Sequence, residues 1–142
     1  MKSIGARIRA MRRFAWILLA ACLSVLAGAC SGISDPSKNT IQDFMGTLEP
    51  LAGKDHEFDV NRSGEYTATI TALAPDPGAA FNIHLGQFVN GLCTPILGQE
   101  RIAALNRLAL NSTIQKGHYC IRLYDLGIIT RTQTYTLRVS HP

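Results

Sequence analysis

The chain has 142 residues and a formal net charge of +4, from 14 Lys and Arg against 10 Asp and Glu. Five of the basic residues precede Cys30 and all of the acidic residues follow it, so the chain from Cys30 onward is slightly acidic. Its basic residues are scattered and are not interleaved with aromatic residues. This composition excludes a nucleic-acid partner, because neutralising phosphates requires a basic patch.

The first 29 residues have the order of a secretory signal peptide. A basic start is followed by an apolar run over residues 14–27 and by small residues before Cys30. Because roughly 20 apolar residues are needed to cross the hydrocarbon core of a bilayer, this run is short for a transmembrane helix. We predict a signal peptide over residues 1–29, forming an N-terminal helix, with either Met1 or Met11 as its start.

Residues 26–30 (Leu-Ala-Gly-Ala-Cys) resemble the lipobox of bacterial lipoproteins. The resemblance implies cleavage before Cys30 and lipidation of its thiol and amine. The Ser31 that follows implies sorting to the outer membrane, as in enteric bacteria. The family prefers Leu where Ala27 stands, and residues 27–29 also fit cleavage by the ordinary signal peptidase. Two destinations therefore stay open: an outer membrane lipoprotein facing the periplasm or the exterior, and a soluble secreted protein.

The cysteine count fits lipidation. After removal of residues 1–29, Cys30, Cys93 and Cys120 remain, and an exported protein with an odd cysteine has one thiol to explain. Lipidation of Cys30 accounts for that thiol and leaves Cys93 and Cys120 as a pair. Their spacing lacks the C-x-x-C of redox sites, and a zinc site would need more ligands. We therefore predict a structural disulfide between Cys93 and Cys120, which an oxidising compartment permits.

The rest of the chain divides into a linker and one domain. Residues 30–41 are polar and contain Gly and Pro, which is typical of a flexible linker. Residues 42–142 have short runs rich in β-branched and aromatic residues, separated by Gly, Pro, Asn and Asp. This pattern predicts an all-β fold, an antiparallel, jelly-roll-like β-sandwich of about 7–9 strands. The expected strands cover residues 42–48, 57–60, 65–73, 80–88, 108–114, 118–125 and 132–139.

The clearest strand is 65–73, where threonines alternate with Tyr66, Ala68, Ile70 and Ala72, which we expect to face inward. We expect residues 90–99 to form a loop. Residues 101–110 also fit a helical spacing, but we expect a strand, a turn around Asn106 and a second strand.

Three segments then resemble the bacterial pre-peptidase C-terminal domain. They are residues 63–70, residues 117–125 (Gly-His-Tyr-Cys-Ile-Arg-Leu-Tyr-Asp) and residues 135–139. The resemblance covers roughly residues 43–139 and implies a small extracellular β-sandwich of a kind often appended to secreted peptidases. The cysteine pair is not general to that family, and we expect the module to stand alone, without a peptidase domain before it. Some relatives bind calcium, but the acidic residues here form no D-x-D-x-D loop, so we expect no metal.

No histidine or serine falls in a catalytic motif. The histidines lack H-x-x-x-H and H-E-x-x-H spacing, and no serine lies in a G-x-S-x-G elbow. We expect His56 to be solvated, His84 to be exposed, and His141 to be mobile near the chain end. Asp125 is expected to cap a turn. The four tyrosines are expected in the core and in strand pairs: Tyr66, Tyr119, Tyr124 and Tyr135.

These observations favour a lipid-anchored, non-catalytic β-sandwich module with a binding or structural role at the cell envelope. Its expected partners are the membrane, through the lipid, and an envelope protein or polysaccharide, and no cofactor is expected. The alternative is a secreted accessory domain that assists a separate peptidase or glycan-active enzyme. An enzyme with an unrecognised site would need a cleft holding a histidine–carboxylate pair with a perturbed pKa.

Overall fold

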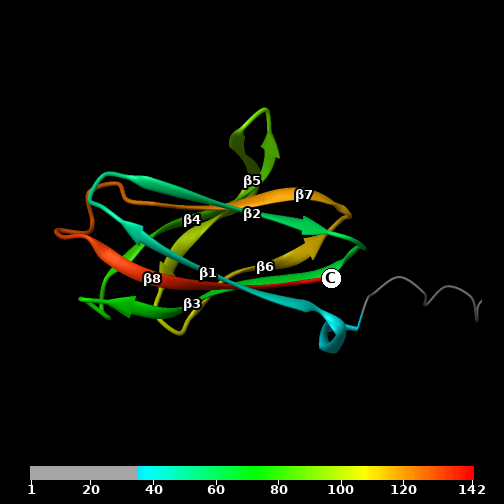
Figure 1. The fold of residues 1–142 in the computed structure, drawn as a ribbon, viewed down its shortest axis with the longest axis horizontal. Coiled ribbons are helices and arrows are strands. Elements are labelled where there is room, and N and C mark those ends of the chain that lie inside the picture. The colour runs from blue at the N-terminus through cyan, green and yellow to red at the C-terminus, as the bar shows by residue number, and fades with distance from the viewer. Residues whose placement is uncertain (1–34) are drawn as a thin grey trace, which may run out of the picture. The chain divides into compact units, whose positions relative to one another are not determined.

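The protein is an all-β sandwich, as predicted. The computed structural model describes residues 35–142, and residues 1–34, including the expected signal peptide and Cys30, lie outside the described residues. Two four-stranded antiparallel sheets pack face to face, in the orders β1-β8-β3-β6 and β2-β7-β4-β5 (Figure 1). The strands are β1 (Thr40–Leu48), β2 (Gly53–Val60), β3 (Gly64–Ala74), β4 (Ala80–Val89), β5 (Leu92–Ala104), β6 (Leu108–Ile114), β7 (Gly117–Tyr124) and β8 (Gln133–His141).

The core forms between the two sheets from the alternating apolar residues of the strands. In β3, Tyr66, Ala68 and Ile70 are buried, as the period of two predicts. The expectation for Ala72 is wrong, because the pairing of β3 with β8 shifts register between Ile70 and Ala72. This bulge places Leu73 in the core and leaves Ala72 exposed.

Ordered structure begins earlier than the expected linker boundary at residue 41. A short 3-10 helix, η1 (Pro36–Lys38), precedes β1, and the Asp35 side chain caps it by accepting a hydrogen bond from the Ser37 N–H. The Asn39 side chain then donates to the Glu65 carbonyl at 2.8 Å. These contacts fix the segment against β3, so the linker expected over residues 30–41 is too long at its C-terminal side.

The expected loop over residues 90–99 is also wrong. Asn90 and Gly91 have φ values of 53° and 81°, and they join β4 to β5, which already begins at Leu92. The strand–turn–strand expectation around Asn106 is confirmed, because β5 ends at Ala104 and β6 begins at Leu108. Asn106 adopts a φ of 57° and its N–H donates to the Ile70 carbonyl at 2.8 Å.

The connections gather at two ends of the sandwich. We call the end where β1 begins the proximal end. It also holds the β2–β3 and β6–β7 connections, whereas the β4–β5 hairpin rises from the middle of the sandwich (Figure 1). The opposite, distal end holds two loops close together, residues 49–52 and residues 125–132, which we call the distal loops. Within residues 35–142, no helix has the length and apolar character needed to span a membrane.

Candidate functional site

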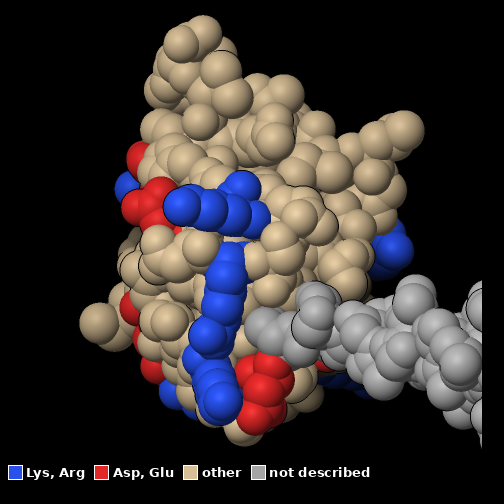
Figure 2. All heavy atoms as spheres, turned by 90° about the vertical axis from the view of Figure 1, so that its right-hand side faces the viewer, with Lys and Arg blue, Asp and Glu red and all other residues tan. Residues whose placement is uncertain are grey.

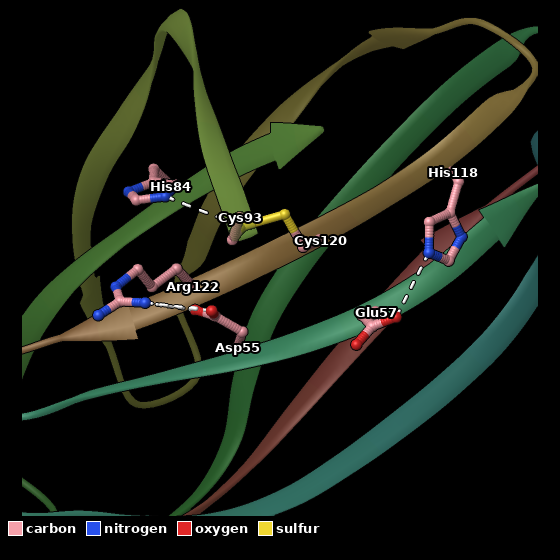
Figure 3. Close-up of a disulfide and its surroundings, with 7 residues drawn as sticks. All are labelled: Asp55, Glu57, His84, Cys93, His118, Cys120 and Arg122. Carbon is pink, nitrogen blue, oxygen red and sulfur yellow. Dashed lines mark hydrogen bonds and ion pairs between the residues drawn. A yellow bond between two sulfur atoms is a disulfide. The ribbon is translucent and has the colours of Figure 1, made fainter. Parts of the chain in front are cut away.

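The outer face of the β2-β7-β4-β5 sheet carries charged side chains in cross-strand pairs (Figure 3). Asp55 of β2 lies opposite Arg122 of β7, and Arg122 Nη1 donates to both carboxylate oxygens at 2.9 and 3.1 Å. Gly53 makes room for this guanidinium, since a Cβ there would lie 2.6 Å from Arg122 Nη2. The Tyr124 hydroxyl donates to Glu100 of β5 on the same face. These pairs tie the strands of the sheet to one another.

His118 is held between two carboxylates at the proximal part of this face (Figure 3). Its Nδ1 lies 2.7 Å from Asp59 Oδ1, and its Nε2 lies 3.3 Å from Glu57 Oε2. The ring also packs edge-on against Phe88, with 5.5 Å between ring centroids. The hydrogen bond with Asp59, helped by Glu57, raises the pKa of His118 above its ordinary value. Because each ring nitrogen faces a carboxylate of β2, the protonated ring of His118 forms ion pairs that join β7 to β2.

The predicted cysteine pair is joined in the structure. The sulfur atoms of Cys93 and Cys120 are 2.09 Å apart and the two Cα atoms are 5.8 Å apart. β4 lies between their strands, and two strands that flank a third in a flat sheet are about 9.6 Å apart. β5 therefore folds over the outer face at Gly86, where a Cβ would lie 2.8 Å from Cys93 Sγ and 2.6 Å from the Thr94 carbonyl oxygen.

This crossing explains why the expectation for His84 is wrong. His84 lies on the outer face of β4, opposite the inward-facing residues of that strand, but it is buried. Its Nε2 lies 4.0 Å from Cys93 Sγ, and its ring lies 5.4 Å from the ring of Tyr124. Burial lowers the pKa of His84 below its ordinary value. The face was predicted correctly, but the folded-over β5 covers it.

His56 is not solvated, because it faces the space between the sheets. It is only 8% exposed, and its Nε2 lies 2.7 Å from the Tyr135 hydroxyl oxygen. The ring of Phe44 lies 5.0 Å from the imidazole ring. Gly46 leaves the space for this pair, since a Cβ there would lie 2.5 Å from Tyr135 Oη. Burial lowers the pKa of His56 to about 4 and raises that of Tyr135 to about 12, so both are neutral near pH 7.

The expectation that His141 is mobile is also wrong. His141 ends β8 opposite Thr40 and is buried, with its ring 5.1 Å from the ring of Phe58. Burial lowers its pKa. His141 and His118 line a groove of about 420 Å³ at the proximal end. Within residues 35–142, no group of three or more His, Cys, Asp and Glu side chains is arranged to hold a metal ion.

Asp125 caps a turn, as predicted, and it also joins the two distal loops. Its Oδ1 accepts hydrogen bonds from the N–H groups of Ile128 and Ile129, at 2.7 and 3.1 Å. Its Oδ2 accepts from the N–H of Leu51 at 2.9 Å, and its own N–H donates to the Ala52 carbonyl. Burial favours a higher pKa for Asp125, but these hydrogen bonds outweigh burial and lower the pKa below its usual value.

The distal loops present three aliphatic side chains to solvent. Leu51 is 76% exposed, Leu126 is 70% exposed and Ile128 is 51% exposed. A Cβ at Gly127 would lie 3.6 Å from Leu51 Cδ2, so the two loops are in contact. Leu51 holds a left-handed φ of 62°, which is uncommon for a residue with a branched side chain. The Asp125 hydrogen bond to its N–H supports this conformation. The distal loops therefore form a fixed apolar surface.

The other residues considered from the sequence have structural contacts. The Ser63 hydroxyl donates to Gln115 Oε1 at 2.6 Å, between two proximal turns. Tyr66, Tyr119 and Tyr135 are in the core as expected, whereas Tyr124 lies half-buried on the outer face. The lipidation site predicted at Cys30 lies outside the described residues.

Comparison with known proteins leaves the family open. No protein-family model matches the chain, and no curated protein is significantly similar to it. The resemblance to the pre-peptidase C-terminal domain stays a prediction.

Part of the site was readable in the sequence. His56 precedes Phe58 and Val60 at steps of two, and His141 follows Tyr135, Leu137 and Val139 at the same step. This period places both histidines on the buried face. The burial of His84 and the contact between the distal loops depend on segments far apart in the chain, so no local sequence pattern predicts them.

Proposed function

We propose that the protein is a lipid-anchored, non-catalytic module of the bacterial cell envelope that binds a partner through its distal loops. The anchor is supported by Cys30 and the signal-like residues before it. Binding is supported by one observation above the others. The distal loops expose Leu51, Leu126 and Ile128 on a surface that Asp125 holds in place.

Exposed aliphatic side chains on a fixed surface favour association. Fully burying a leucine or isoleucine side chain contributes roughly 1.5–3 kcal/mol. Only the surplus over the cost of ordering the interface appears as affinity. Because Asp125 already orders both distal loops, a partner that covers them would not have to offset that cost.

The position of the distal loops suits a partner other than the anchoring bilayer. The five residues from Cys30 to Asp35 can span at most about 18 Å. They lead to the proximal end, and β1, with nine residues, runs from there for about 30 Å to the distal end. An anchor at Cys30 therefore holds the proximal end near the membrane and leaves the distal loops open to an envelope protein or polysaccharide.

Labelling with radioactive palmitate tests the anchor. The parent protein should take up label and the Cys30→Ala variant should not. Equal labelling of the two proteins would contradict lipidation at Cys30 and leave the secreted alternative.

Site-specific photo-crosslinking in native membranes tests the binding surface. A photoreactive amino acid at position 126 should give a discrete adduct. The same amino acid at Met45, which is exposed on the outer face of β1, serves as the matched control and should give none. Leu51→Asp should abolish the adduct from position 126 while the protein stays folded. An adduct that forms equally from positions 126 and 45, or that survives Leu51→Asp unchanged, would contradict binding by the distal loops.

A further inference from the structure

The β4–β5 hairpin, residues 86–99, is a second exposed apolar feature, distinct from the distal loops. Its turn residues, Asn90 and Gly91, both have positive φ, which is the geometry of a tight type I′ turn. Figure 1 shows the hairpin rising above the sheet beside the β5 label. The hairpin leaves the sheet about midway between the two ends of the sandwich, because Gly86 pairs with Cys120, which pairs with Glu57 in the middle of β2.

β5 carries a large bulge behind the turn of the hairpin. His84 of β4 pairs with Glu100 and Gly86 pairs with Pro95, so residues 96–99 of β5 have only Leu85 opposite them. Gly98 adopts a φ of 80° within the bulge, and a Cβ added there would meet no heavy atom within 4 Å beyond its chain neighbours. The bulge turns Leu97 away from the sheet, and that side chain is 99% exposed.

The hairpin is aliphatic and carries no charge. Val89 is 49% exposed and Leu92 is 68% exposed, beside the fully exposed Leu97. No Lys, Arg, Asp or Glu occurs between Asp76 and Glu100. The uppermost part of the molecule in Figure 2, where the hairpin rises, accordingly shows neither basic nor acidic side chains. The Arg101 guanidinium borders the bulge, because its Nη1 donates to the Gly98 carbonyl at 3.1 Å.

The hairpin is also fixed before it meets a partner. The Cys93–Cys120 disulfide joins the hairpin to β7 two residues after Gly91 of the turn, and Gly86 lets β5 lie close over β4. A fixed hairpin presents its three aliphatic side chains without an ordering cost at the moment of binding.

We propose that the β4–β5 hairpin inserts its tip into the bilayer that holds the lipid at Cys30. The proposal rests on the lipid anchor of the proposed function. A tether of at most about 18 Å between Cys30 and Asp35 keeps the start of β1 at the membrane surface. It allows the outer face of the β2-β7-β4-β5 sheet, from which the hairpin rises, to lie against the bilayer. Uncharged aliphatic side chains partition into the interface between headgroups and acyl chains. The distal loops are equally apolar but lie at the end of the sandwich opposite the start of β1, farther from the tether than the hairpin. This difference assigns the hairpin to lipid and the distal loops to a second partner.

A tryptophan reporter tests the insertion. Trp16 is the single tryptophan of the chain and precedes the proposed cleavage site, so the processed protein has none. The processed, lipidated L97W protein is reconstituted into vesicles of phosphatidylethanolamine and phosphatidylglycerol, with and without bromine on the acyl chains. We expect blue-shifted emission and quenching by the brominated lipid. The matched control, L126W, places the reporter on a distal loop and should show neither. Emission at position 97 that is no more quenched than at position 126 would overturn the proposal.

A second arm separates failure of the hairpin from failure of the anchor. Full-chain protein carrying Cys30→Ser is sedimented with the same vesicles, alone and with Leu97→Asp. Burial of one leucine corresponds to roughly tenfold in affinity or more, so Leu97→Asp should weaken this binding by at least about tenfold. Equal binding by the two proteins would overturn the insertion, even where palmitate labelling shows that the anchor exists. Quenching and the Leu97→Asp loss in a chain that takes up no palmitate would support the hairpin and reject the anchor.

Discussion

The β4–β5 hairpin and the distal loops both expose aliphatic side chains, but different chemistry holds each in place. The hairpin is fixed covalently, by a disulfide that crosses β4 at Gly86. The distal loops are fixed by one carboxylate, since Asp125 accepts hydrogen bonds from the backbone of both loops. The comparison teaches that an exposed apolar surface in a small domain is kept rigid by a specific contact behind it. We call this contact its brace: the disulfide for the hairpin and Asp125 for the distal loops. Each brace can be removed separately.

Removing the disulfide should have the largest effect and should act on the hairpin. The bond closes a loop with a sequence separation of 27 residues, for which the chain-entropy estimate is roughly 3.5 kcal/mol. The double variant Cys93→Ala with Cys120→Ala should lose about 3 kcal/mol of unfolding free energy in denaturant titration. Hydrogen exchange should rise over residues 86–99 and stay nearly unchanged over residues 125–132.

Gly86→Ala tests the same crossing without removing sulfur. A methyl group there would collide with the Thr94 carbonyl oxygen and with Cys93 Sγ, so free thiols should appear and the hairpin should loosen. A fully oxidised Gly86→Ala protein of parental stability would show that β5 does not lie across β4 as described.

Mild acid should have the next largest effect on stability, through the buried histidines. Burial lowers the folded-state pKa of His56 from 6.5 to about 4. Between these values the unfolded chain binds the extra proton, so stability falls as the pH drops from 6.5 toward 4, by about 3 kcal/mol for His56. His84 and His141 have lowered pKa values and act in the same direction.

The acid effect should reach the hairpin before the distal loops. His84 lies beneath the hairpin, with Glu100, Arg122 and Asp55 as its charged neighbours. Asp125 stays ionised until the pH falls below 3.8, because its folded-state pKa is lowered. Thermal unfolding against pH, with hydrogen exchange at pH 5, checks this order. A free energy of unfolding that does not change between pH 6.5 and 4, or distal loops that open before the hairpin, would contradict this order.

Asp125→Asn should have a smaller effect, limited to the distal loops. The amide cannot accept from both loops at once, so a buried backbone N–H loses a charged acceptor, at a cost of about 2 kcal/mol. Hydrogen exchange should rise over residues 49–52 and 125–132 and not over residues 86–99. Loosening of the hairpin in this variant would show that the two braces are coupled.

His118 should show the smallest change and the opposite sign. Its pKa is raised by Asp59 and then by Glu57, so its contribution to stability is present below pH 6.5 and is lost as the pH rises through its folded-state pKa. NMR titration should place the pKa of His118 above that of an ordinary histidine, and Asp59→Asn should lower it. A His118 pKa that Asp59→Asn does not change would contradict the ion pairing of His118 with Asp59 and Glu57.

The sequence predicted the strands better than it predicted what covers them. The alternation at Tyr66, Ala68 and Ile70 identified β3 because a half-buried strand leaves a period of two. The bulge that exposes Ala72 leaves no such mark, since it arises from pairing with β8. A loop was expected where the hairpin lies, because Asn90, Gly91 and Gly98 are turn residues and the strand between them is short of alternating residues.

For each brace, the sequence predicted the local feature but not the long-range contact. The cysteine count alone predicted the pairing of Cys93 with Cys120. That the bond folds β5 over His84 depends on the lack of a side chain at Gly86. Asp125 was predicted as a turn cap from its local position, but its contact with Leu51 joins residues 74 positions apart. Contacts across such separations are fixed by the packing of the two sheets, which no local pattern encodes.

Intact-mass measurement of the protein extracted from membranes tests the central claim most directly. A lipid-anchored module predicts a chain that begins at Cys30, carries the added mass of acyl groups, and takes up no alkylating agent until it is reduced. A chain that begins at Cys30 with no added mass, or that still carries residues 1–29, would contradict the anchor on which the roles of the hairpin and the distal loops depend.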